Sequence, residues 1–98
     1  MKTISFEWDE QKNKKNIAKH GISFEEASTV FCDDDALVFD DPDHSAYEER
    51  FLVIGLSFNE RLCIVSHCYR DDDNVIRLIS ARLATKKEKK VYNDNLLR

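Results

Sequence analysis

Three strand-like runs follow one another in the second half of the sequence, with only short polar turns between them. The runs are "RFLVIGLSF" (50–58), "RLCIVSHCYR" (61–70) and "VIRLISARLA" (75–84), all rich in Val, Ile and Leu. The segments that connect them, "NE" and "DDDN", are typical of hairpin turns. A parallel crossover needs a dozen residues or more, so neighbouring strands in this region are expected to pair antiparallel. The sequence therefore predicts an antiparallel meander sheet.

The first 32 residues predict a strand and two helices. "ISFEW" opens the chain as a short strand, and Asp9 then caps a polar helix over 10–19 that Gly21 ends. This helix has little apolar surface, so we expect it to lie exposed with one side shallowly packed. The segment "SFEE" predicts a capping box, Ser23 with Glu26, at the start of a second helix that runs to about Cys32.

The remaining elements complete an α+β domain. A short strand over 36–40 precedes an acidic loop, and Thr85 caps a last helix in "TKKEKKVYNDNLL". The expected order is βααββββα. A chain of 98 residues supports one modest core, so we expect a single domain spanning residues 1–98.

Charge is distributed unevenly along the chain. Residues 25–49 carry ten acidic side chains and no basic one, while the formal net charge of the whole chain is only −4. The segments on either side are basic: 1–24 has five Lys or Arg against three acids, and 50–98 has ten against six. A net-negative protein of this kind can still present a positive patch to an anionic partner.

Two arginines of the last strand-like run are candidate anion ligands. Counting alternate positions places Arg77 and Arg82 on opposite faces of the strand. Both lie among apolar residues, where a cation requires a carboxylate partner or an anionic ligand. A structural ion pair and a functional role both stay open for each. Arg82 is the stronger functional candidate because it lies at the strand end, which solvent and ligand can reach.

The first helix predicts a row of cations. Lys12, Lys15 and Lys19 recur at i, i+3 and i+7 on one face, and His20 follows directly. Ammonium groups beside a side chain that titrates near neutral pH suit a phosphodiester substrate. The alternative for the lysines is solvated helix surface, and for His20 it is a cap on the helix C-terminus.

Other chemistry is less well supported by the sequence. Glu49 beside Arg50 is a candidate general base or a simple ion-pair partner, and His44 lies in the same acidic region. The histidines and cysteines lack zinc-ligand spacing, and the aspartate triplets lack an EF-hand pattern. We therefore expect no metal and no cofactor. The three cysteines form no C-x-x-C pair, and no secretory or membrane-spanning segment is evident, so we expect reduced thiols and a cytoplasmic protein without a membrane partner.

Three separated motifs resemble the BrnT family. They are "FEWDEQKNKKNIAKHGISFEEASTVF", "DPDHSAYEERFLVIGLS" and "IRLISARLATKKEKKVY", and together they extend from about Phe6 to Tyr92. The positions shared by motif are Trp8, Asp9, Lys12, Asn16, Lys19, His20, Gly21, Glu49, Arg50, Arg77, Ser80, Ala81, Arg82, Glu88 and Tyr92. One departure is Tyr69, where the family pattern has an acid directly before the position of Arg70.

The resemblance implies a RelE-like fold and a toxin of a type II toxin–antitoxin system, a ribonuclease that inhibits translation. It also implies a BrnA-like antitoxin with a ribbon-helix-helix domain, which we expect to form a 2:2 complex with the toxin and to bind operator DNA. On this basis we assign catalysis to His20, Glu49, Arg77 and Arg82, without metal. We assign RNA contacts to Lys12, Lys15, Lys19, Arg50, Arg70 and Tyr92.

Two further points stay open on the sequence. Trp8 is either a stacking platform for a base or part of the core. The protein as a whole is either the ribonuclease just described or a non-catalytic partner-binding protein that acts only as co-repressor with its antitoxin. In the second case the basic cluster would be the interface for an acidic antitoxin segment.

Overall fold

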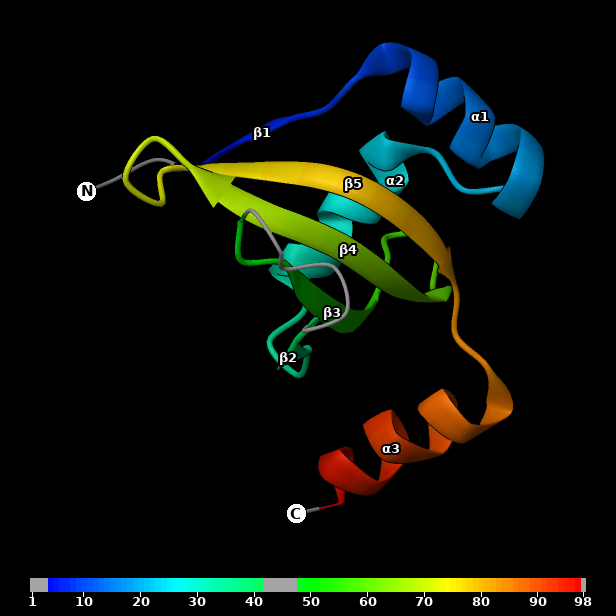
Figure 1. The fold of residues 1–98 in the computed structure, drawn as a ribbon. Helices are drawn as coiled ribbons and strands as arrows, with labels where there is room; N and C mark the ends of the chain where they lie inside the picture. The colour runs from blue at the N-terminus through cyan, green and yellow to red at the C-terminus, as the bar shows by residue number, and fades with distance from the viewer. Residues whose placement is uncertain (1–3, 42–47, 98) are drawn as a thin grey trace.

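The computed structural model describes residues 4–41 and 48–97 and shows a five-stranded sheet with helices on both of its faces (Figure 1). The order across the sheet is β1-β5-β4-β3-β2. The strands are β1 (Ser5–Glu7), β2 (Leu37–Asp40), β3 (Phe51–Leu56), β4 (Leu62–Arg70) and β5 (Val75–Leu83). The helices are α1 (Glu10–His20), α2 (Phe24–Ser28), the 3-10 turn η1 (Thr29–Cys32) and α3 (Lys86–Leu96). The expected α+β class is confirmed.

The sheet is mixed, which corrects the prediction of a purely antiparallel meander. Strands β2 to β5 pair antiparallel in chain order, as their short connections require. β1 instead pairs parallel with β5, with Phe6 opposite Ile76. The whole of the intervening chain separates these two strands, so no short turn dictates their relative direction.

A bulge in β5 changes which side chains share a face. Ser66 pairs with Ser80 and His67 pairs with Leu78, so Ile79 is an extra residue without a partner on β4. Arg77 consequently lies opposite Cys68, and Arg82 lies opposite Ile64. Cys68 and Ile64 are four residues apart on one strand and share a face. The two arginines therefore lie on the same face, and the predicted opposite placement is wrong.

α1 has the caps predicted for it but a different buried face. The Asp9 carboxylate accepts from the backbone N–H of Gln11 at 2.8 Å, and Gly21 ends the helix with a φ of 72°. The buried side chains are polar, Asn13 and Asn16, whereas the apolar Ile17 is 45 % exposed. The helix packs through hydrogen bonds as much as through apolar contact.

The second helix forms only half of the predicted capping box. The Ser23 hydroxyl accepts from the N–H of Glu26 at 3.0 Å, as expected. The Glu26 carboxylate turns away to Arg61, because a guanidinium provides a stronger partner than a backbone N–H. The α-helix ends at Ser28 and continues to Cys32 as a 3-10 turn.

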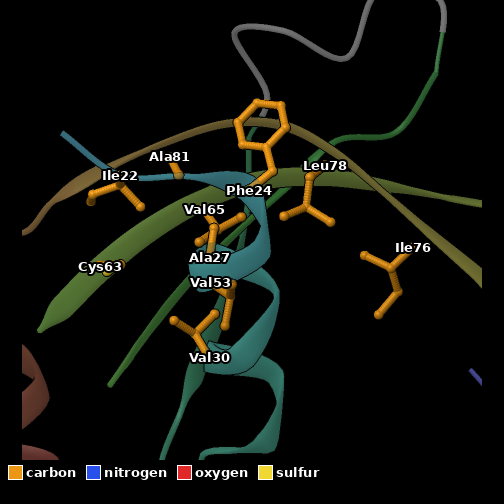
Figure 2. Packing of buried hydrophobic residues seen from close by; sticks show 10 residues of the cluster. All are labelled: Ile22, Phe24, Ala27, Val30, Val53, Cys63, Val65, Ile76, Leu78 and Ala81. Carbon is orange, nitrogen blue, oxygen red and sulfur yellow. The ribbon is translucent and has the colours of Figure 1, made fainter. Parts of the chain in front are cut away.

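The main core lies between α2, η1 and one face of the sheet. Figure 2 shows Phe24, Ala27 and Val30 in one cluster with side chains of the central strands, including Val53 and Val65. Complete burial of a side chain such as Phe24 contributes about 2 kcal/mol. A smaller cluster on the opposite face joins Ile54 and Ile64 to Ala84 and Tyr92 of the C-terminal segment. The sheet face that carries the arginines is therefore covered only in part, by α3.

Candidate active site

The sheet face opposite α2 carries two arginines with a pair of serines between them. Ser66 and Ser80 pair across β4 and β5, between the positions of Arg77 and Arg82. Ser80 is exposed, and the two guanidinium-bearing side chains are 32 % and 41 % exposed. We call Arg77, Ser80, Arg82 and Ser66 the arginine face. It presents forked cationic donors and the hydroxyl of Ser80, while Ser66 is buried, and guanidinium and hydroxyl groups together bind phosphate oxygens.

Arg82 is held in place by Glu88 of α3. Two hydrogen bonds of 2.8 Å join the guanidinium to the two carboxylate oxygens. Glu88 also accepts from the backbone N–H of Thr85, which completes the capping box of α3. The guanidinium lowers the pKa of Glu88 to about 2, so the pair stays charged throughout the physiological range. The pair orients Arg82 and joins the arginine face to the last helix.

The other arginines of this region also have carboxylate partners. Arg77 donates to Glu7 of β1 at 2.7 Å. Glu48 lies 2.8 Å from Arg70 and 3.6 Å from Arg50. The structural alternative, an ion pair, is thus realised for both Arg77 and Arg82. Because both side chains stay partly exposed, ion pairing leaves them accessible to an anionic ligand.

Glu49 lies away from Arg82. It is exposed and lines a cavity of about 420 Å³ with Glu48, Phe51, Tyr69 and Asp73. Tyr69 lies five residues along β4 from Ile64, the residue that pairs with Arg82. Five strand residues span roughly 15 Å, so Glu49 and Arg82 lie toward opposite ends of the sheet. The four residues predicted to be catalytic are therefore not brought into one cluster.

The lysine row is exposed on α1, as its spacing predicted. Lys12, Lys15 and Lys19 all face solvent, and His20 is the last residue of the helix. Within residues 4–41 and 48–97, no hydrogen bond or ion pair joins this helix to Arg77 or Arg82. The link between the two groups is Asn16, whose amide bonds the backbone of Ala81, the residue before Arg82.

Three polar residues to which the sequence interpretation gave no role hold this region together. Asn13 accepts from the backbone N–H of Phe24 at 2.8 Å, and Asn16 bonds Ile22 and Ala81. Arg61 pairs with Glu26 and donates to the carbonyl of Gly21 at 3.1 Å, next to His20. Two asparagines three residues apart in a highly charged helix are a detectable signal, since asparagine is a poor helix former.

Several aromatic and histidine side chains have packing roles. Tyr92, predicted to contact RNA, is 6 % exposed, and its hydroxyl donates to Asp33 at 2.6 Å. Trp8 packs edge-on against Phe24, which supports its core interpretation. His67 is fully buried among aromatic rings, and burial lowers its pKa, so it is neutral at pH 7. His44 lies outside the described residues.

In the described part of the chain, no three His, Cys, Asp or Glu side chains are grouped so as to bind a metal ion. None of the helices that the structure describes combines the length and apolar character that crossing a membrane requires.

Comparisons with known proteins identify the family. The profile described as "Ribonuclease toxin, BrnT, of type II toxin-antitoxin system" matches residues 8–88. Among solved structures, the crystal structure of the Brucella abortus ribonuclease toxin BrnT superimposes with a TM-score of 0.66 and 28% sequence identity, covering 86% of this chain and 100% of that chain. Comparison with curated protein sequences finds no significant match. This chain therefore belongs to the BrnT family of ribonuclease toxins from type II toxin–antitoxin systems.

Proposed function

We propose that this chain cleaves RNA on its arginine face without a metal ion and thereby inhibits translation. The observation that carries the proposal is the placement of Arg77 and Arg82 on one partly exposed face with Ser80 between them. Cleavage of a phosphodiester builds negative charge on the phosphate, and preoriented guanidinium groups stabilise that charge. Two forked donors on one face can contact the same RNA segment, which two arginines on opposite faces could not.

Proton transfer requires a group within hydrogen-bond reach of the scissile phosphate. His20 lies at the same end of the sheet as Arg82, since Arg61 at the start of β4 contacts Gly21. Glu49 lies at the other end, next to Glu48, the partner of Arg70. One phosphate cannot contact both groups, so His20 and Glu49 are competing candidates. Replacing each in turn, His20→Ala and Glu49→Gln, identifies the one whose removal abolishes the chemical step.

RNA binding extends, in this proposal, over two cationic surfaces. The exposed row Lys12, Lys15 and Lys19 contacts phosphates beyond one edge of β5. Arg50 and Arg70 contact them at the opposite end of the sheet. Because Tyr92 is buried, it affects RNA binding only indirectly, by fixing the position of α3.

The partner proposed for this toxin is a BrnA-like antitoxin. Membership of a type II family implies an antitoxin and an RNA substrate. We propose a ribbon-helix-helix antitoxin, a 2:2 complex that binds operator DNA, a RelE-like classification of the toxin fold and a cytoplasmic site of action. The mass of the co-expressed complex and its binding to operator fragments test the assembly.

The decisive experiment is RNA cleavage by the purified full-length protein in excess EDTA. We expect cleavage to persist and Arg82→Ala to abolish it while the protein stays folded. Activity that disappears with the chelator and returns with magnesium would reject the metal-free mechanism. The ion pairing of both arginines is the observation that favours the alternative, a non-catalytic co-repressor. Folded protein that neither cleaves RNA nor arrests growth would favour that alternative.

A further inference from the structure

A groove with an apolar floor lies between α3 and the end of the sheet where β4 begins and β5 ends. Its volume is about 430 Å³, and its floor is formed by Leu56, Leu62, Leu83 and Ala84. Leu56 and Leu83 remain 39 % and 46 % exposed. Figure 1 shows this end of the sheet between the C-terminus of α1 and the start of α3. Apolar side chains gathered in an exposed groove indicate a contact surface for another molecule.

The rim of this groove carries Lys89 and Arg61 together with one acid, Glu60, and it adjoins a lysine-rich helix. Lys89 of α3 lines it, and the same helix carries Lys86, Lys87 and Lys90. The two acids of α3 already have partners, Glu88 with Arg82 and Asp94 with Lys90. Lysines in the first turns of a helix oppose its dipole, which costs a few tenths of a kcal/mol each. A loss of helix stability that no contact within the fold offsets indicates that these charges have a function.

The chemistry of the groove distinguishes among possible occupants. The four apolar side chains of the floor offer an RNA backbone no donor, and among the other lining residues Arg61 is ion-paired with Glu26 and the Tyr92 hydroxyl donates to Asp33. A second copy of this chain would have to bring its acidic segment, residues 25–49, against the lysines of the rim, and the dimer that this predicts is one outcome of the test. An amphipathic helix with leucine-like residues on one side and Asp or Glu on the other satisfies both the floor and the rim.

We infer that this groove binds an acidic amphipathic helix of the antitoxin. The inference rests on the proposed function, since it assigns the surface by which the toxin is captured. It differs from an interface over the basic cluster predicted from the sequence, because the anchoring contacts are the apolar side chains of the groove. By register, Leu83 lies on the face opposite to that of Arg82, whereas Leu56 and Leu62 share the face of Arg82. Leu83 is therefore the floor residue to change when RNA cleavage is to be left intact.

The test is the affinity of variant toxins for the purified cognate antitoxin. Leu83→Asp places a carboxylate on the apolar floor, and we expect binding to weaken about a hundredfold. Lys89→Glu, on the exposed rim, should weaken binding about tenfold at low salt and less at high salt. Val91→Asp is the matched control, because Val91 is exposed to the same degree (44 %) but lines a different hollow, with Leu37 and Phe39. We expect it to bind the antitoxin like the original protein.

Two further measurements on the same proteins separate the alternatives. RNA cleavage by Leu83→Asp should be unchanged, and circular dichroism should show the native fold; Lys89→Glu provides the test if Leu83→Asp does not fold. Antitoxin binding that survives Leu83→Asp, or that is abolished by Val91→Asp, would overturn the inference. So would an antitoxin-free dimer that Leu83→Asp dissociates, or a parallel decrease in RNA affinity. A protein that binds antitoxin as expected but cleaves no RNA would refute only the proposed ribonuclease activity.

Discussion

The side-chain amide of Asn16 hydrogen-bonds both backbone polar groups of Ala81. Its oxygen accepts from the N–H at 3.0 Å, and its nitrogen donates to the carbonyl at 2.8 Å. β1 pairs with β5 only as far as Arg77, so Ala81 lies beyond the last strand pairing on that edge. The amide thus occupies the place of a missing strand residue. A residue of the lysine-bearing helix thereby fixes the strand segment that presents Arg82.

Replacing Asn16 by Ala should destabilise the fold by about 2–3 kcal/mol. The change leaves buried backbone groups of Ala81 and Ile22 without their partner, and an unsatisfied buried polar group costs about 1–3 kcal/mol. Urea unfolding followed by circular dichroism measures the effect. Lys15→Ala, on the exposed side of the same helix, should change the free energy of unfolding by less than about 0.5 kcal/mol. Equal effects of the two changes would show that the amide bridge contributes nothing.

Replacing Arg82 by Ala should lower the rate of RNA cleavage about a hundredfold or more, since in the proposed mechanism it removes a charged donor from the reacting phosphate. Stability should fall by less than about 1 kcal/mol, because the ion pair with Glu88 is partly exposed. Single-turnover cleavage and thermal unfolding measure the two effects. Lys90→Ala is the control, since that cation is also ion-paired, with Asp94 of the same helix, and is no part of the proposed RNA-binding surface. A variant of Arg82 that simply unfolds would reveal a structural role.

Lys19→Ala should weaken RNA binding and reduce its salt dependence. Removing one phosphate interaction with a single strand lowers the slope of log K against log salt by about 0.7. Fluorescence anisotropy with a labelled RNA, measured over a salt series, gives this slope. Lys14→Ala is the matched control: it is an exposed lysine of α1 outside the row. An identical slope for both variants would exclude Lys19 from the RNA-binding surface.

Acid should destabilise the protein through Glu26. Its hydrogen bond with Arg61 lowers the pKa to about 2 from the ordinary value of 4.5. A depressed pKa stabilises the fold above the unfolded value, so this contribution is complete above about pH 4.5 and disappears as the pH falls toward 2. Glu26→Gln should cost about 2 kcal/mol at pH 7, and the difference from the original protein should narrow in that interval.

Urea unfolding at pH 7, 4.5 and 3 follows this difference. Glu25→Gln, an exposed neighbour on the same helix, should show no such dependence. A gap between Glu26→Gln and the original protein that is constant across these pH values would contradict the assignment to the carboxylate.

The local features of the sequence predicted local structure well. Asp9, Gly21 and Thr85 delimit their helices as expected, because capping depends on residues a few positions apart. The antiparallel pairing of β3 with β4 and of β4 with β5 could be predicted from the length of the turns alone. The features that the sequence did not predict depend on distant partners. Three interactions are of this kind: the parallel pairing of β1 with β5, the ion pair of Glu26 with Arg61, and the ion pair of Arg82 with Glu88 of α3. Each joins two different elements of the fold, and no local pattern predicts that they meet.

The extra residue in β5 decides whether the two arginines of the candidate site lie on the same side of the sheet. Arg77 and Arg82 are five positions apart, an odd interval that an unbroken strand would split between the two sides of the sheet. Ile79 absorbs one position and turns the odd interval into an effectively even one. A homologue with one residue fewer here would regain a regular ladder with both arginines still on one side. A homologue that kept the length without the bulge would carry one of its arginines into the core.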